Sequence, residues 1–228
     1  MNRKNRADNV IALRALMEEK FPEAHRRMAS VGRAGVCAAA GLEGLGIVEG
    51  SVVEIVARGP SRGAGLLLMR VLEGWIRERR RVALVDGKDG FDAANLAEED
   101  RGWMLWIRCR GAEEAVQAAD LLLRDGNLEA VFLDLQLNAE RELRRLPSSI
   151  WHRLRALAEA SGRTLFGFTP CRLIGSAAVR VEMESRYTAA VFDLPRETLG
   201  RELRFEVFRR RWGGGSGMGA EERAALSG

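Results

Sequence analysis

The amino-acid sequence predicts an α/β protein in which helices flank a mostly parallel central sheet, with an antiparallel β extension and an additional N-terminal helix. Three observations predict this class. Short β-branched runs alternate with amphipathic helical stretches along most of the chain. A glycine-rich loop joins the first such run to the first helical stretch. Towards the C-terminus, strand-like segments follow one another without long helices, which indicates an antiparallel addition.

Composition limits the classes of protein. The chain has 228 residues, of which 46% are hydrophobic, enough for one large domain with a substantial core. The net charge of +4 comes almost entirely from arginine, which suits nucleic acid or acidic partners but also ordinary solvated helix faces. Cys37, Cys109, Cys171, His25 and His152 are widely spaced, so we expect a reduced compartment and no metal site. With no signal peptide or membrane segment in view, we expect a cytoplasmic protein that does not contact membranes.

The N-terminal stretch, residues 1–44, is predicted to be a helix followed by a linker. Asp8 can cap a helix that ends near Pro22, and residues 23–44 are small and rich in glycine and alanine. One face of this helix carries an apolar stripe formed by Val10, Leu13, Leu16, Met17 and Phe21. The stripe either docks on a partner or packs on the main domain. Residues 45–212 form the predicted core, and residues 213–228 a flexible glycine-rich tail.

The core begins with a strand, a glycine-rich loop and a helix. Ser51–Val56 is β-branched, and the apolar residues that follow Gly65 recur at helical spacing. This is the frame of a phosphate cradle, because backbone N–H groups converge there on an anion. A simple βα turn that binds no phosphate is the alternative interpretation. The loop comprises Arg58, Gly59, Pro60, Ser61, Arg62, Gly63, Ala64 and Gly65.

The remaining core elements follow from the same patterns. Helical stretches are expected over Phe91–Asp100, over 112–125, and over 138–161 with a break near Pro147. Further strands are expected over the following segments: Arg81–Val85, Trp103–Cys109, Glu129–Asp134, Thr164–Phe168, Ala177–Met183, 188–194 and 201–209.

Between residues 45 and 184, the order of elements and several strings resemble the core of RecA. Gly46–Ile55 (GIVEGSVVEI) resembles the approach to the RecA P-loop, and Leu84–Asp92 (LVDGKDGFD) resembles the turn that carries its catalytic glutamate. Ala112–Asp134 resembles its helix and Walker B strand, and is the most specific match. Ala178–Glu182 (AVRVE) is similar to a later strand. The resemblance therefore implies a RecA-like core.

The departures from that pattern remove the catalytic groups. Ala64 and Gly65 occupy the positions of the P-loop lysine and hydroxyl residue, and Lys88 occupies that of the catalytic glutamate. Pro170 replaces the nucleotide-sensing glutamine, whereas Asp134 matches the Walker B acid. The two DNA-binding loops of RecA have no counterpart of similar length or sequence. We therefore predict that the protein is not an enzyme and that it needs no cofactor.

A RecA-like chain with these losses resembles ImuA, a RecA-related family of mutasome accessory proteins that is also related to the SulA cell-division inhibitors. The resemblance implies a non-catalytic adaptor in SOS-induced translesion DNA synthesis and mutagenesis. Its implied partner is an ImuB-type Y-family polymerase homologue, with RecA and a DnaE-type polymerase as further candidates. In RecA the N-terminal helix packs on the neighbouring protomer, so the resemblance makes the stripe from Val10 to Phe21 the partner-binding surface.

Two other functions stay open. The first is a weak DNA-dependent ATPase that remodels RecA filaments, with Arg62 replacing the missing lysine; Ala64, Gly65 and Lys88 argue against it. The second is a SulA-like inhibitor of cell division, against which the arginine-rich helix and the basic charge weigh slightly.

Two further hypotheses concern charged residues. Lys88 and Asp134 both follow predicted strands, so they either pair in the vacated site or Lys88 points into solvent. The second hypothesis is that clustered arginines make weak, salt-sensitive contact with DNA, or contact a partner protein. Its candidate residues are Arg141, Arg144, Arg145, Arg209, Arg210, Arg211 and Trp212.

Overall fold

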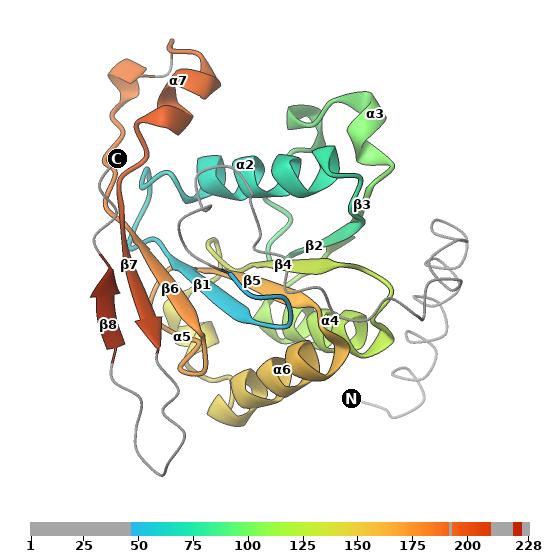
Figure 1. The fold of residues 1–228 in the computed structure, drawn as a ribbon. Helices are drawn as coiled ribbons and strands as arrows, with labels where there is room; N and C mark the ends of the chain where they lie inside the picture. Colours follow the sequence, from blue (N-terminus) through green and yellow to red (C-terminus); the bar gives the residue numbers. More distant parts are fainter. Residues whose placement is uncertain (1–46, 192, 211–220, 225–228) are drawn as a thin grey trace.

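A single sheet organises the chain in the computed structural model, which describes residues 47–191, 193–210 and 221–224 (Figure 1). The sheet has eight strands in the order β3-β2-β4-β5-β1-β6-β7-β8. The strands are β1 Val52–Val56, β2 Val82–Asp86, β3 Met104–Arg108, β4 Ala130–Asp134, β5 Thr164–Thr169, β6 Val179–Met183, β7 Phe205–Arg210 and β8 Glu221–Ala224. The helices are α2 Ala64–Arg77, α3 Glu98–Arg101, α4 Ala112–Asp125, α5 Glu140–Leu143, α6 Ser148–Ser161 and α7 Arg196–Arg201, with 3-10 turns η3 Ala93–Asn95 and η4 Ala189–Val191.

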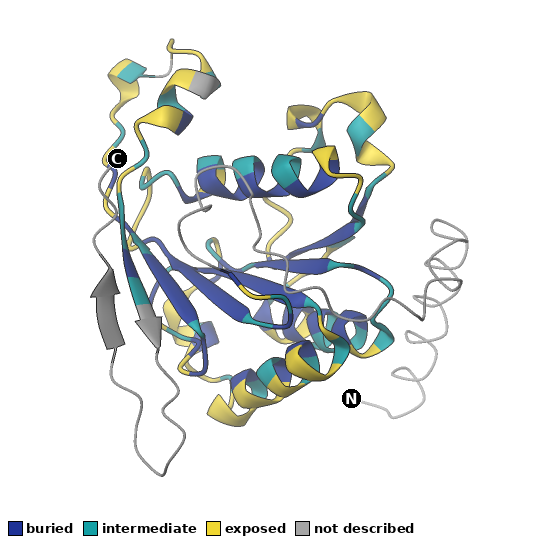
Figure 2. Ribbon diagram, in the orientation of Figure 1, coloured by how far each residue is buried: buried dark blue, intermediate teal, exposed yellow. Residues whose placement is uncertain are grey.

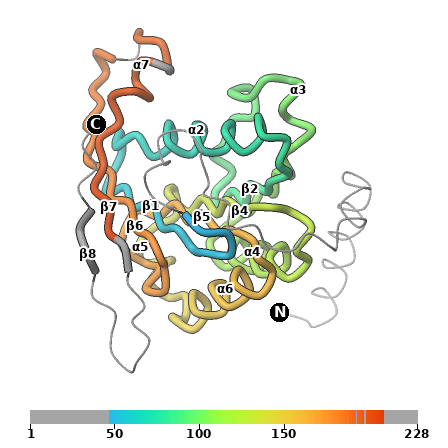
Figure 3. Tube along the Cα trace, viewed as in Figure 1, coloured from blue at the N-terminus to red at the C-terminus, as the bar shows by residue number. Residues whose placement is uncertain are grey.

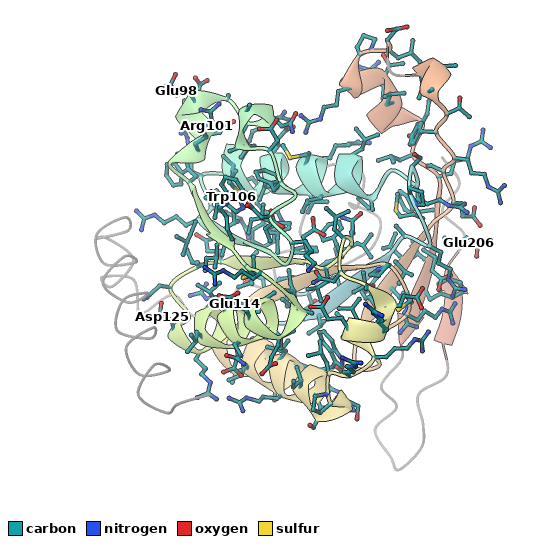
Figure 4. All side chains as sticks on the ribbon, turned by 180° about the vertical axis from the view of Figure 1, so that it is seen from behind. Glu98, Arg101, Trp106, Glu114, Asp125 and Glu206 are labelled. Atoms are coloured by element: carbon teal, nitrogen blue, oxygen red, sulfur yellow. The ribbon has the colours of Figure 1, made fainter. Side chains whose placement is uncertain are left out.

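The strands from β3 to β6 in sheet order are all parallel, and β7 and β8 continue the sheet in antiparallel fashion. Figure 4 shows Trp106 on the edge strand β3 and Glu206 on β7 near opposite ends of this sheet. The predicted class is therefore confirmed: a mostly parallel sheet, flanked by helices and extended by antiparallel strands, consistent with a RecA-like core.

Helices cover both faces of the sheet. The chain places α2 and α3 on one face before it reaches β3, and then α4, α5 and α6 on the other (Figure 3). Because both faces are covered, β1, β2 and β5 are buried along their whole length, and the outer faces of the helices stay exposed (Figure 2). Such burial requires nearly continuous apolar strands, which is the pattern that the sequence has.

The core under α2 is organised by aromatic side chains. Trp75 of α2 packs edge-on against Phe166 of β5, with ring centroids 6.0 Å apart. Phe166 in turn stacks on Phe132 of β4 at 4.9 Å. All three side chains are fully or almost fully buried, so they join the helix to the middle of the sheet by apolar burial and by favourable ring geometry.

Several predicted helices and strands differ in detail. The stretch Phe91–Asp100 is not one helix but η3 followed by α3, with the Asp92 side chain capping η3. The break near Pro147 is confirmed, because Pro147 directly precedes α6.

The C-terminal predictions are partly wrong. No strand forms over 188–191 and 193–194, the described residues of this segment; η4 lies here, and α7 follows. Leu194 is 43% exposed and Pro195 lacks a backbone N–H, so these residues neither bury an alternating apolar row nor complete a ladder. The strand expected over 201–209 is observed in part, because β7 begins at Phe205 and Arg201 ends α7. The predicted helix over residues 1–44 lies outside the described residues, whereas Glu221–Ala224 of the predicted tail pairs with β7.

A buried ion pair fixes the centre of the sheet. Glu54 of β1 is fully buried, and its carboxylate lies 2.7 Å from the Arg180 guanidinium of β6. The same carboxylate accepts hydrogen bonds from the backbone N–H groups of Leu173 and Ile174, both at 2.7 Å, and from the Thr169 hydroxyl at 3.3 Å. A buried charge is costly unless it is fully paired, so these contacts stabilise one arrangement of β1, β5, β6 and the β5–β6 loop.

We predict that Glu54→Gln destabilises the fold by about 3 kcal/mol, because it removes the buried carboxylate charge that pairs with the Arg180 guanidinium. The measurement is the free energy of unfolding in urea. Glu159→Gln is the control, since it removes an exposed (i, i+4) pair with Arg155 and should change this free energy by less than about 0.5 kcal/mol. Equal effects of the two substitutions would refute the central role of Glu54.

Candidate functional site

The candidate site lies at the carboxyl ends of the parallel strands, where an open α/β sheet gathers its loops. The loop after β1 spans residues 57–63, and the turn after β2 begins at Gly87. The segments after β4 and β5 begin at Leu135 and Pro170. The fold therefore brings the glycine-rich loop, Lys88 and Asp134 to the same edge of the sheet, as the sequence predicted.

The end of the glycine-rich loop is covered by the C-terminal part of the chain. Gly63 precedes α2 with φ +83°, a left-handed conformation that favours glycine. A Cβ atom at Gly63 would lie 2.5 Å from Leu203 and 3.0 Å from the Tyr187 ring. Tyr187 also donates its backbone N–H to the Ser61 carbonyl at 2.9 Å, and its hydroxyl to the Leu199 carbonyl at 2.7 Å. Side chains of this protein therefore pack closely on the N-terminus of α2.

The two residues that the RecA resemblance aligns with the P-loop lysine and hydroxyl carry no charged or hydroxyl group. Ala64 is 3% exposed and belongs to the hydrophobic core, and Gly65 is exposed but has no side chain. Arg62 is the only cation between Gly59 and Gly65, and it makes no hydrogen bond or ion pair with any described residue.

The turn after β2 is built by the Asp86 carboxylate. It accepts hydrogen bonds from the backbone N–H groups of Lys88 at 3.2 Å, Gly90 at 3.1 Å and Phe91 at 2.7 Å. A carboxylate that organises a turn in this way satisfies backbone donors that would otherwise lack partners. Lys88 is exposed, and its ammonium group donates to the Arg110 carbonyl at 3.3 Å. Asp86 thus has a structural part that sequence analysis did not assign to it.

Asp134 lies beside Asp86, since the two residues are register partners on β4 and β2. Its carboxylate accepts hydrogen bonds from the backbone N–H and the side-chain amide of Gln136, at 3.0 and 3.2 Å. Burial, with a smaller contribution from the Asp86 charge, raises the pKa of Asp134 to about 6. The hypothesis of a Lys88–Asp134 pair is wrong. The Lys88 ammonium group bonds to the carbonyl of Arg110, which follows β3, and the Asp134 carboxylate bonds to Gln136.

Close backbone packing joins the two turns. Gly87 donates its N–H to the Asp134 carbonyl at 2.8 Å, and Asn138 donates its side-chain amide to the Gly87 carbonyl at 3.2 Å. A Cβ atom at Gly87 would meet the Asp134 carbonyl at 2.8 Å, so only glycine fits there. Glu142 accepts from the Asn138 amide and from the Ala112 N–H, and the latter bond contributes most to lowering the pKa of Glu142.

The residues proposed for DNA or partner contact are distributed over two regions. Arg141 and Arg144 belong to α5 and its C-cap, and Arg145 follows; all three are exposed. Arg209 and Arg210 belong to β7. Arg211, Trp212 and the N-terminal stripe lie outside the described residues.

Within the described part of the chain, no group of three or more His, Cys, Asp or Glu side chains could hold a metal ion. None of the described helices is long and apolar enough to cross a membrane. The chain was also compared with known proteins. No family model matches it, and no curated protein matches it either.

Sequence analysis gave no role to Glu54 and Arg180, although both occur in the strings that resemble RecA. A signal was present, because each is a charged residue with apolar neighbours on both sides in a β-branched run (VVEIV and AVRV). A charge inside a fully buried strand needs an opposite charge nearby, and the sequence offered these two as a candidate pair.

We predict that Asp134→Asn stabilises the fold at pH 8 and has little effect at pH 4. The folded-state pKa of about 6 lies above the ordinary value of 3.8, so ionising Asp134 costs stability as the pH rises from 4 through 6. Removing the charge should recover on the order of 2 kcal/mol at pH 8. Urea unfolding of both proteins at pH 4, 6 and 8 tests this. A difference that does not grow with pH would contradict it.

Proposed function

We propose that the protein is a non-catalytic, RecA-like adaptor of the ImuA type in SOS-induced translesion DNA synthesis. It binds an ImuB-type Y-family polymerase homologue, with RecA and a DnaE-type polymerase as further partners, and so modulates recombination against mutagenic synthesis in the cytoplasm. The observation that carries the proposal is the combination of a RecA-like sheet with a glycine-rich loop that has lost its catalytic groups.

Three features of the edge support a function without turnover. Ala64 contributes to the core where a lysine would reach phosphates, and Lys88 bonds to a backbone carbonyl where a glutamate would orient water. Leu203 and Tyr187 pack on Gly63, at the helix N-terminus where a phosphate would receive backbone N–H groups. A protein that keeps this scaffold without the chemistry is suited to present surfaces to partners.

A weak ATPase is the alternative that a specific observation favours. Arg62 makes no hydrogen bond or ion pair with the described residues and lies in the loop next to Gly63, so it is available to an anion. Measuring ATP turnover with and without single-stranded DNA separates the two functions. The adaptor predicts no turnover above background, whereas turnover that Arg62→Gln abolishes would favour the ATPase.

We predict that the purified full chain captures the ImuB-type homologue or RecA equally well with and without ATP, because the proposed interface needs no bound nucleotide. The measurement is a pull-down with immobilised protein and purified partners. Capture only with ATP would mean that the loop still binds nucleotide. Capture of neither partner would contradict the adaptor and favour a SulA-like inhibitor of cell division.

The N-terminal stripe generates a separate prediction. If it docks on a partner, the double variant Leu13→Ser/Leu16→Ser should reduce capture at least about tenfold, since burying two leucines is worth roughly 3 kcal/mol or more. Glu19→Ser alters the same predicted helix on the face opposite the stripe and is the matched control. Unchanged capture after deletion of residues 1–30 would show that the stripe is not the docking surface.

A further inference from the structure

A pocket of about 290 Å³ lies where the loops after β1 and β5 meet the short helix α5. The segments that form it are far apart in the sequence and meet only through the fold. Three of its lining residues are arginines, one from each segment. The lining residues are Arg58, Gly59, Glu140, Arg144, Cys171 and Arg172.

Two of the arginines keep hydrogen-bond donors for a ligand. The Arg58 side chain is 64% exposed, and its closest carboxylate, that of Glu182, is 3.9 Å away, beyond hydrogen-bond distance. The Arg144 side chain is 68% exposed and bonds to Glu140 through one terminal nitrogen at 3.2 Å. A guanidinium group has five N–H donors, so both arginines can bind an oxyanion without breaking their present contacts.

The pocket is built on a rigid base. Arg172 forms an ion pair with Glu182 and lies over the Phe208 ring at 5.2 Å. The residues after it, Leu173 and Ile174, are held by their backbone bonds to Glu54 in the core. This side of the pocket is therefore held in place before an anion arrives.

The chemistry of the lining indicates binding and not reaction. Burial raises the pKa of the Cys171 thiol, which favours the protonated, poorly nucleophilic form. Gly59 presents backbone to the pocket with open space around its Cβ position. Arg62 and Gly63, at the other end of the glycine-rich loop, do not line the pocket.

We propose that this pocket binds a phosphate group, held by the guanidinium groups of Arg58 and Arg144. Arginine suits this ligand because its planar fork donates two parallel hydrogen bonds to phosphate oxygens. The phosphate belongs either to a small molecule or to a nucleic-acid backbone. This proposal does not rest on the adaptor function. Phosphate binding is measured with the purified protein alone, whereas the adaptor function is measured by the capture of partners, so either can fail without the other.

The test is isothermal titration of the full chain with pyrophosphate, and fluorescence anisotropy with a labelled single-stranded oligonucleotide, both at low salt. Arg58→Gln and Arg144→Gln should each weaken binding of at least one probe about tenfold or more, because each removes charge-assisted hydrogen bonds. Two substitutions allow for one of them disturbing the fold. Arg77→Gln is the matched control: Arg77 is 72% exposed and bonds to Glu73 one turn away at 3.4 Å, as Arg144 does to Glu140.

The two probes separate the sources of the phosphate. An effect on pyrophosphate supports a small phosphorylated ligand, and an effect on the oligonucleotide alone supports a nucleic-acid backbone. If neither probe binds, or if the pocket variants behave like Arg77→Gln, the proposal is wrong. It is equally wrong if Arg62→Gln abolishes binding and the pocket variants do not, because the anion would then sit at the end of the loop.

Discussion

The centre of the sheet depends on one buried carboxylate. Glu54 lies in the middle of β1 with no exposed surface, and Arg180 and two backbone N–H groups of the β5–β6 loop satisfy it. A charge in this position is costly unless every partner is in place, so the contact specifies one arrangement of β1, β5 and β6. The loop that it fixes also carries Arg172, which lines the arginine pocket.

At the carboxyl ends of the parallel strands, groups of the protein bond to and pack on one another. Asp86 receives three backbone N–H groups of its own turn, Gly87 packs against the Asp134 carbonyl, and Leu203 packs on Gly63. The edge is thus held by internal hydrogen bonds and apolar contacts. Asp134 differs from these stabilising groups, because burial disfavours its charged form. Polar groups that are held at a cost to stability are typical of functional sites.

The sequence was informative where burial is continuous. The strands from β1 to β6 are short apolar runs between turn residues, so their positions were predicted closely, and with them the common edge of the loop, Lys88 and Asp134. It was misleading over 188–194, where Ala189, Ala190 and Leu194 are exposed. It was also misleading for the Lys88–Asp134 pair, because Lys88 bonds to Arg110 and Asp134 bonds to Gln136 instead. The arginine pocket was not predictable, because its residues lie at positions 58, 144 and 172 and only the crossover connections bring them together.

The main stabilising contacts of the sheet lie away from the glycine-rich loop. The sheet is stabilised by the aromatic core under α2 and by the Glu54–Arg180 pair, and neither involves the glycine-rich loop. The Ala64 side chain is part of the hydrophobic core, so alanine at this position contributes to the stability of the fold. Where stability and catalysis are carried by different residues, the second can be lost without the first. Selection can then act on the surfaces that remain, such as the pocket formed by Arg58 and Arg144.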